Sequence, residues 1–282
     1  MVDPRAVTEW EESTMSGRSR FLGVLALFAA TALAVVATPA SATQKQTKPT
    51  IVLVHGAFAD ASSWNGVIPL LQAQGYPVVA VPNELRSVKG DAAEVSAVLK
   101  SITGPIVLVG HSYGGSVITN AAEGNPNVKA LVYVAAFAPE VGESAAALSA
   151  KFPGSTLGPA LAKPVALPGG GNDLFIDQAK FHDQFAADVP AAQAALMAAG
   201  QRPITEAALN EPSANAAWKN IPSWFVYGSA DKNIPAQAQA FMAQRAGSKE
   251  TVVVDGASHV VMVSHPDQVA KIIQNAAATA TE

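Results

Sequence analysis

Residues 106–115 constrain the fold of this chain more than any other stretch. Four apolar residues, 106–109, indicate a buried parallel strand that leads directly into the pattern G-H-S-Y-G. A run with helical character, residues 116–123, follows at once. Strand, tight turn and helix in this order predict a turn that strains the backbone of Ser112 and exposes its hydroxyl above the sheet edge. The alternative interpretation is a glycine-rich turn with an incidental serine.

Apolar runs that are typical of buried strands alternate with amphipathic runs along the rest of the chain. This alternation predicts an α/β fold, a mainly parallel sheet with helices on both faces. The expected strands span residues 50–55, 76–81, 106–110, 128–135, 224–228 and 250–254. The expected helices span residues 62–75, 91–101, 116–123, 235–246 and 266–277.

Residues 139–218 break the alternation because they contain no convincing strand. They hold a proline and glycine cluster at 164–171 and alanine-rich helical segments at 186–199 and 205–210. A stretch of about eighty residues is too long for a plain connection between two strands. We therefore expect a helical cap, inserted over the C-terminal edge of the sheet.

The N-terminal residues 1–42 have the pattern of a Sec-type signal peptide. Two arginines precede the apolar run 21–37, and A-S-A then forms an A-x-A cleavage site that ends at Ala42. Cleavage there leaves residues 43–282 as a secreted or periplasmic domain with no stable membrane association. The alternative is an uncleaved anchor, since the apolar run is nearly long enough to span a bilayer.

Composition and residue order limit the start of translation, the cysteine chemistry, the export route and the binding partners that we expect. Acidic residues 9–12 stand in front of Met15, which suggests that translation starts at Met15 and that residues 1–14 are not translated. The chain has no cysteine, so disulfides, thiol nucleophiles, thiolate metal sites and lipoprotein anchors are excluded. Ser19 separates the two arginines, so the twin-arginine export pattern is missing. The formal net charge of −4, without a basic block, argues against nucleic acid as a partner.

A serine hydroxyl is a weak nucleophile until a base takes its proton. Of five histidines, His259 follows the last expected strand, at the sheet edge where Ser112 also lies. The base in turn needs a carboxylate to orient it. Asp231 projects from the end of the neighbouring strand, and Asp255 is the rival. Asp255 precedes His259 by only four residues, which makes a return contact difficult, so Asp231 is preferred.

Two backbone N–H groups are expected to stabilise the oxyanion that forms at Ser112. One belongs to Tyr113, directly after the serine. The other is assigned to Ala57 in the loop after the first strand, where Gly56 allows a close approach. Aromatic residues on the same loops predict an apolar substrate pocket. Its expected walls are Phe58, Trp64 and Phe137. Phe152, Phe175, Phe181 and Phe185 lie in the cap, where each is expected in the cap core before the pocket wall.

Residues 50–277 resemble an α/β-hydrolase, in the branch that contains plant methyl esterases and hydroxynitrile lyases. The strongest matches are V-L-V-H-G-A-F at 52–58, V-G-H-S-Y-G-G at 109–115 and S-H at 258–259. The chain looks most similar to small bacterial members of that branch. The cap, residues 139–218, matches least, so substrate preference does not transfer.

The resemblance implies a hydrolase of small carboxylic esters that needs neither metal nor other cofactor. It assigns Ser112 as nucleophile, His259 as base and Asp231 as the acid of the triad, in the chain order expected of this fold. It also supports Ala57 and Tyr113 as oxyanion donors. A small-molecule ester is therefore the expected partner, and the sequence carries no indication of the oligomeric state.

The lyases of this branch carry a threonine near the first-strand turn and a lysine just after the catalytic histidine. The matching positions here are Gly56 and Val260, and both departures favour an esterase. Three hypotheses follow. The first is a secreted ester hydrolase with an acyl-enzyme on Ser112. The second is a lyase or carbon–carbon bond hydrolase that uses the same site. The third is a ligand-binding protein that keeps the fold without turnover.

Overall fold

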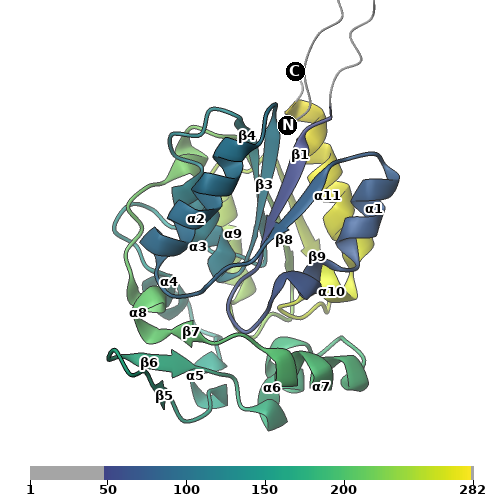
Figure 1. Ribbon diagram of the computed structural model, residues 1–282. Coiled ribbons are helices and arrows are strands. Elements are labelled where there is room, and N and C mark those ends of the chain that lie inside the picture. Colours follow the sequence, from purple (N-terminus) through teal and green to yellow (C-terminus); the bar gives the residue numbers. More distant parts are fainter. Residues whose placement is uncertain (1–47, 281–282) are drawn as a thin grey trace, which may run out of the picture. The chain divides into compact units, whose positions relative to one another are not determined.

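The main sheet has six strands in the order β2-β1-β3-β4-β8-β9, and every pairing in it is parallel (Figure 1). The structure is a computed structural model and describes residues 48–280. The expected signal peptide, its cleavage site after Ala42 and the start at Met15 lie outside the described residues. The strands are β1 Thr50–Val54, β2 Val78–Val81, β3 Ile106–His111, β4 Val128–Val134, β8 Ser223–Gly228 and β9 Glu250–Val254.

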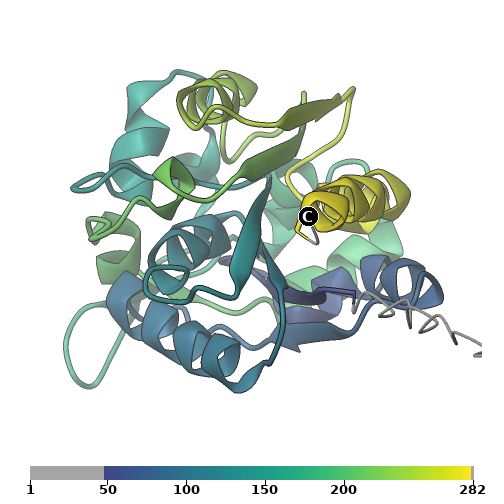
Figure 2. The ribbon, with the colours of Figure 1, turned by 90° about the horizontal axis from the view of Figure 1, so that it is seen from above.

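Helices cover both faces of this sheet, which confirms the predicted α/β architecture (Figures 1 and 2). The helices α1 (Val67–Ala73) and α11 (Pro266–Thr279) pack on one face. The other face carries α2 (Val88–Ser101), α3 (Tyr113–Ala121) and α9 (Ala236–Arg245). Every residue of β3 is buried, as the apolar run 106–109 predicts for a central parallel strand.

Local capping explains where two helices depart from the predicted bounds. α2 begins three residues earlier than expected because the Ser87 hydroxyl accepts a hydrogen bond from the N–H of Gly90 and caps the helix. The predicted helix 62–75 is divided into a 3-10 turn, η1 (Ala61–Trp64), and α1. Gly75 has φ of 76° just after α1, which is the left-handed conformation that ends a helix at glycine.

The cap, at the carboxyl ends of the strands, contains strands as well as helices (Figure 1). The prediction of a cap without strands is wrong, because β5, β6 and β7 form a small antiparallel sheet. These strands have only two or three residues each, too few for any periodicity to be visible in the sequence. The cap elements are α4 Ala145–Lys151, α5 Leu157–Ala160, β5 Val165–Ala166, β6 Asn172–Leu174, α6 Gln178–Phe185, α7 Ala191–Gly200, β7 Ile204–Thr205, α8 Glu206–Asn210 and η2 Ala217–Lys219.

The small cap sheet is tied to the loop between β2 and α2. The Thr205 N–H donates to the Leu85 carbonyl at 3.1 Å, and the Thr205 hydroxyl donates to the Arg86 carbonyl at 2.8 Å. The Arg86 guanidinium forms an ion pair with Asp173 of β6 at 2.5 Å. These bonds hold the cap over the sheet edge. Within residues 48–280, no helix is both long and apolar enough to cross a membrane.

Candidate active site

Ser112 occupies a strained turn between β3 and α3. Its backbone has φ of 53° and ψ of −123°, which a residue with a side chain rarely adopts. The N–H groups of Gly115 and Phe137 donate to the Ser112 carbonyl at 2.9 and 3.1 Å and hold the turn in place. The Ser112 hydroxyl makes no capping bond to α3. The turn therefore presents this hydroxyl without engaging it in the fold.

Two glycines let the loop after β1 pack against this turn, backbone to backbone. A Cβ at Gly114 would lie 2.6 Å from the Val54 carbonyl oxygen. A Cβ at Gly56 would lie 2.6 Å from the Ser112 Cβ and 3.0 Å from the Tyr113 nitrogen. Real Cβ atoms do not approach so closely, so both positions require glycine. The packing brings Ala57 and Tyr113 to the same side of the site.

His259 and Asp231 form a buried pair at the ends of β9 and β8. The His259 Nδ1 donates to the Asp231 Oδ2 at 2.7 Å, and the two side chains are 1% and 0% exposed. The Gln239 Nε2 also donates to Oδ2 at 2.9 Å, while the N–H groups of Asn233 and Ile234 donate to Oδ1 at 2.8 and 3.0 Å. Four donors thus fix the orientation of the Asp231 carboxylate.

The structure places the rival carboxylate away from the base. Asp255 is exposed, and its Oδ1 accepts a hydrogen bond from the Ser229 hydroxyl at 3.0 Å. The short separation from His259 along the chain explains why it does not turn back onto the ring. Asp231 reaches His259 because parallel strands β8 and β9 end side by side.

Ser112 and His259 line one cavity of about 440 Å³, referred to below as the Ser112 cavity. Ala57 and Tyr113 line it too, and both residues are buried, at 3% and 0% exposure. Within the described part of the chain, neither of their backbone N–H groups has a hydrogen-bond acceptor. Buried N–H groups are almost always paired. Two unpaired ones beside a nucleophilic serine are what an oxyanion hole presents before substrate binds.

Phe58 and Phe137 line the Ser112 cavity, but Trp64 does not. The assignment of Trp64 to the pocket is wrong. Its side chain is fully buried and packs edge to face against the His111 ring, with centroids 6.5 Å apart. Trp64 is the last residue of the 3-10 turn η1. This position directs its side chain into the core beneath the Ser112 turn and not into the cavity.

Much of the cavity wall comes from cap residues that the sequence did not single out. They are small or aliphatic, and nothing in an alanine-rich helix distinguishes a cavity wall from a core. Of the four cap phenylalanines, Phe152 alone lines the Ser112 cavity among the described residues, while Phe181 and Phe185 are fully buried. The cap and loop residues in the wall include Ala145, Ser149, Leu157, Leu161, Leu209, Asn233 and Ile234.

Two other histidines lie close to the site and have structural contacts. The His55 Nε2 accepts the N–H of Asn83 at 2.9 Å, its Nδ1 donates to the Gly56 carbonyl at 3.0 Å, and burial lowers its pKa. The His111 Nε2 donates to the His259 carbonyl at 3.2 Å. Burial holds the pKa of His111 well below its usual range, so this ring stays neutral next to His259. Neither histidine is oriented as a base for Ser112.

Of the remaining two histidines, one makes a contact within the cap and the other lies at the start of α11. The His182 Nε2 donates to the Val189 carbonyl at 2.8 Å. His265 precedes α11, with its Nδ1 2.9 Å from the Ser264 hydroxyl and 3.5 Å from the Asp188 carboxylate. Neither of them lines the Ser112 cavity. Among residues 48–280, no group of three or more histidine, cysteine, aspartate or glutamate side chains could hold a metal ion.

The Tyr113 side chain anchors a residue that lines the Ser112 cavity. It is fully buried, and its hydroxyl donates to the Asp91 Oδ2 at 2.9 Å. The Asp91 Oδ1 accepts the N–H of Arg86 at 3.2 Å. Burial raises the pKa of the Asp91 carboxyl, and the bond from Tyr113 opposes that rise. Sequence reasoning missed Asp91, because an acidic residue early in a helix is commonly a surface residue.

We expect Tyr113→Phe to lower the free energy of unfolding by about 1–3 kcal/mol near neutral pH, since it leaves the buried Asp91 Oδ2 without its donor. The deficit should shrink on acidification. Losing the donor raises the folded-state pKa of Asp91 further, so protonation relieves the cost as the pH falls through that value. Urea unfolding at several pH values measures this. Tyr227→Phe is the control, because the Tyr227 hydroxyl has no partner among the described residues. An equal loss of unfolding free energy in both variants would contradict the anchoring role of the Tyr113–Asp91 hydrogen bond.

Comparison with known proteins agrees with this geometry. The model of the alpha/beta hydrolase family matches residues 51–272. An α-hydroxynitrile lyase of Arabidopsis thaliana is 26% identical over 82% of this chain and 96% of its own length. A pimeloyl-[acyl-carrier protein] methyl ester esterase of Aeromonas hydrophila is 25% identical over 80% of this chain and 94% of its own.

Solved structures show the same fold. The crystal structure of polyneuridine aldehyde esterase superposes with a TM-score of 0.72 and 21% identity, and the match covers 81% of this chain and 99% of that one. The family match spans the parallel sheet, the Ser112 turn and the His259–Asp231 pair. The chain therefore belongs to the alpha/beta hydrolase family.

Proposed function

We propose that this protein is an exported serine hydrolase that cleaves small carboxylic esters through an acyl-enzyme on Ser112. The observation that carries the proposal is the buried Asp231–His259 pair, whose histidine lines the same cavity as a strained Ser112. A buried carboxylate that holds one ring nitrogen of a histidine leaves the other nitrogen to act as a base. The family relationship and the esterases among the relatives support ester hydrolysis in general.

In the proposed mechanism, His259 takes the proton of Ser112 as its oxygen attacks the ester carbonyl. Asp231 stabilises the imidazolium that forms, and the N–H groups of Ala57 and Tyr113 bind the oxyanion. His259 then gives its proton to the departing alcohol, which leaves an acyl group on Ser112. A water that is activated by His259 releases the acid and restores the serine.

The Ser112 cavity supports an uncharged, largely apolar substrate. No Asp, Glu, Lys or Arg side chain is among the described residues that line it. The aromatic walls are Phe58, Phe137 and Phe152, and most of the remaining wall is small or aliphatic. Such a surface suits short alkyl or aryl groups on either side of the ester. It offers no partner for a substrate carboxylate or phosphate.

Cyanohydrin cleavage is the second candidate, because a hydroxynitrile lyase is among the relatives. It requires a cation for the departing cyanide, and Val260 follows His259 where a lysine would be needed. Lys232 is exposed and lines a different surface cavity. At Gly56, a threonine would meet the Ser112 Cβ at 2.6 Å. These three observations favour hydrolysis over the lyase reaction.

Two assays on the purified protein test the proposal. We expect turnover of p-nitrophenyl acetate and no cyanide release from mandelonitrile above the uncatalysed rate. Each assay is repeated with the Ser112→Ala variant as background. Cyanide release that vanishes in this variant would favour the lyase, and the absence of turnover in both assays would favour a binding protein. Export is proposed from the sequence alone, and a mature protein that begins at Thr43 would support it.

A further inference from the structure

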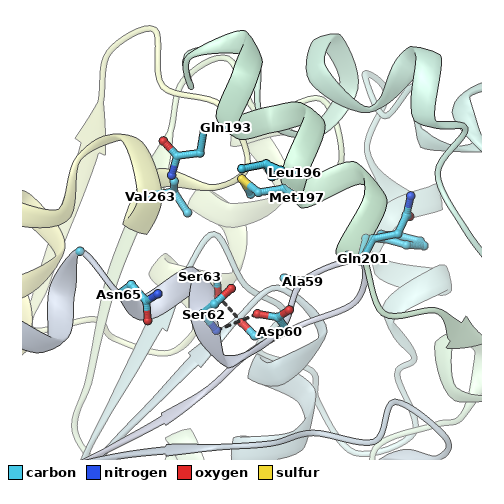
Figure 3. A pocket seen from close by; sticks show the side chains of 13 residues that line it. Ala59, Asp60, Ser62, Ser63, Asn65, Gln193, Leu196, Met197, Gln201 and Val263 are labelled. Atoms are coloured by element: carbon cyan, nitrogen blue, oxygen red, sulfur yellow. Dashed lines mark hydrogen bonds between the residues drawn. The ribbon is translucent and has the colours of Figure 1, made fainter.

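A second cavity lies between the core and the cap and shares one lining residue with the Ser112 cavity. Its volume is about 300 Å³. Figure 3 shows η1 on one side of it and α7 on the other, with Leu196 and Met197 facing Ser62 and Ser63 across the gap. We call this space the η1–α7 cavity. It holds none of the groups assigned to catalysis.

Phe58 is the one described residue that lines both cavities. It directly follows Ala57, is 3% exposed, and has its ring edge to face with Phe185 at 6.1 Å. Its N–H donates to the Arg202 carbonyl at 3.0 Å, just beyond the end of α7. Its backbone φ of 60° is unusual for a bulky side chain. The fold therefore places Phe58 in the wall that the two cavities share, at some conformational cost.

The two sides of this wall differ in chemistry. The Ser112 cavity is mainly apolar, whereas the η1–α7 cavity combines Met197, Leu196 and Val263 with polar side chains. The amides of Asn65 and Gln193 face it from exposed positions, and the Asp60 carboxylate also lines it. Met197, with Leu196 at 75% exposure, forms its apolar side. This apolar side fits the far part of an elongated apolar chain.

We propose that Phe58 is a specificity-determining residue that limits the length of the ester. The η1–α7 cavity is then a distal binding site for the end of a longer acyl chain, closed off from Ser112 by the Phe58 ring. This inference rests on the proposed ester hydrolysis. It accounts for the place of Phe58 in the wall of both cavities and for the space beneath α7.

Truncating Phe58 should lengthen the preferred substrate. We expect Phe58→Ala to raise the ratio of kcat/KM for p-nitrophenyl octanoate over acetate at least tenfold. Each methylene group that becomes buried is worth about fourfold in binding, so two newly accommodated methylenes suffice. Phe175→Ala is the matched control. Phe175 is a half-buried cap residue that lines neither cavity, so its truncation should leave the ratio unchanged.

A double variant ties the effect to the η1–α7 cavity. Adding Met197→Phe to Phe58→Ala refills that space from α7 and should return the ratio to within threefold of the wild-type value. Phe58→Gly serves if Phe58→Ala does not fold, because glycine adopts a positive φ without strain. Circular dichroism checks each variant.

The outcomes separate this inference from the proposed function. A wild-type protein that hydrolyses no ester contradicts the function itself. Activity on acetate with a ratio that changes less than threefold in Phe58→Ala would overturn the role of Phe58 alone. A raised ratio that persists in the double variant would also overturn it, since the longer chain would then lie elsewhere.

Discussion

Ser112→Ala is expected to lower kcat/KM for p-nitrophenyl acetate at least ~10³-fold, because members of a catalytic triad act as a unit. The reaction depends on one hydroxyl that the fold itself does not use. The carbonyl and N–H of Ser112 hold the turn, with bonds to Gly115, Phe137 and Val134, whereas its side chain makes no capping bond. Alanine keeps those backbone bonds, so circular dichroism and urea unfolding should match the wild type.

Ser116→Ala is the control for this substitution. Ser116 lies one turn along α3, is buried, and its hydroxyl has no partner among the described residues. It does not line the Ser112 cavity, so its loss should leave kcat/KM within about twofold, like most substitutions away from a site. Substantial activity in a well-folded Ser112→Ala protein would rule out this nucleophile.

Asp231→Asn should have the second-largest effect on activity, roughly 10–100-fold less severe than that of Ser112→Ala. The four groups around the Asp231 carboxylate, on His259, Gln239, Asn233 and Ile234, are all donors. The amide NH₂ of asparagine is also a donor, so it opposes two of them in either orientation. The backbone N–H groups of Asn233 and Ile234 are fixed by the chain, which favours the orientation that turns the NH₂ towards His259 and Gln239. His259 then loses the acceptor that fixes its ring, and the buried mismatch should cost about 1–3 kcal/mol of stability.

The double variant Ser112→Ala/Asp231→Asn sharpens this test. If both residues serve one step, it should be no slower than Ser112→Ala alone, because the serine is already lost. Asp255→Asn is the matched control, since this exposed carboxylate contacts Ser229 and not His259. A loss of activity in Asp255→Asn but not in Asp231→Asn would assign the orienting role to Asp255 and contradict its assignment to Asp231.

The sheet could be predicted from the sequence because its central strands are buried on both faces. Continuous apolar runs such as 106–109 and 130–135 follow from that burial, and the glycines at 110 and 114 mark the turn that a close backbone approach requires. The pairing of Asp231 with His259 was also predictable, because parallel strands that are neighbours end at the same edge. The position of the Ser112 turn then limits where the histidine and aspartate of a triad can lie.

The cap and the cavity walls could not be predicted in the same way. Strands as short as Val165–Ala166 have no periodicity, and they form by pairing with other short cap segments. Trp64 was placed wrongly because the pattern 62–75 does not reveal the 3-10 turn that directs it into the core. The contact of Asp91 with Tyr113 and the place of Phe58 in a second cavity depend on contacts between distant segments. Spacing along the chain does not reveal such contacts.

The central claim, that Ser112 is a nucleophile activated by His259, has a direct test by covalent labelling. The protein is incubated with a fluorophosphonate, and the labelled site is located by peptide mass spectrometry. The account predicts one adduct on Ser112, absent from Ser112→Ala and formed at least ~10²-fold more slowly in His259→Ala. A label on another residue, or equally fast labelling of Ser112 without His259, would contradict it.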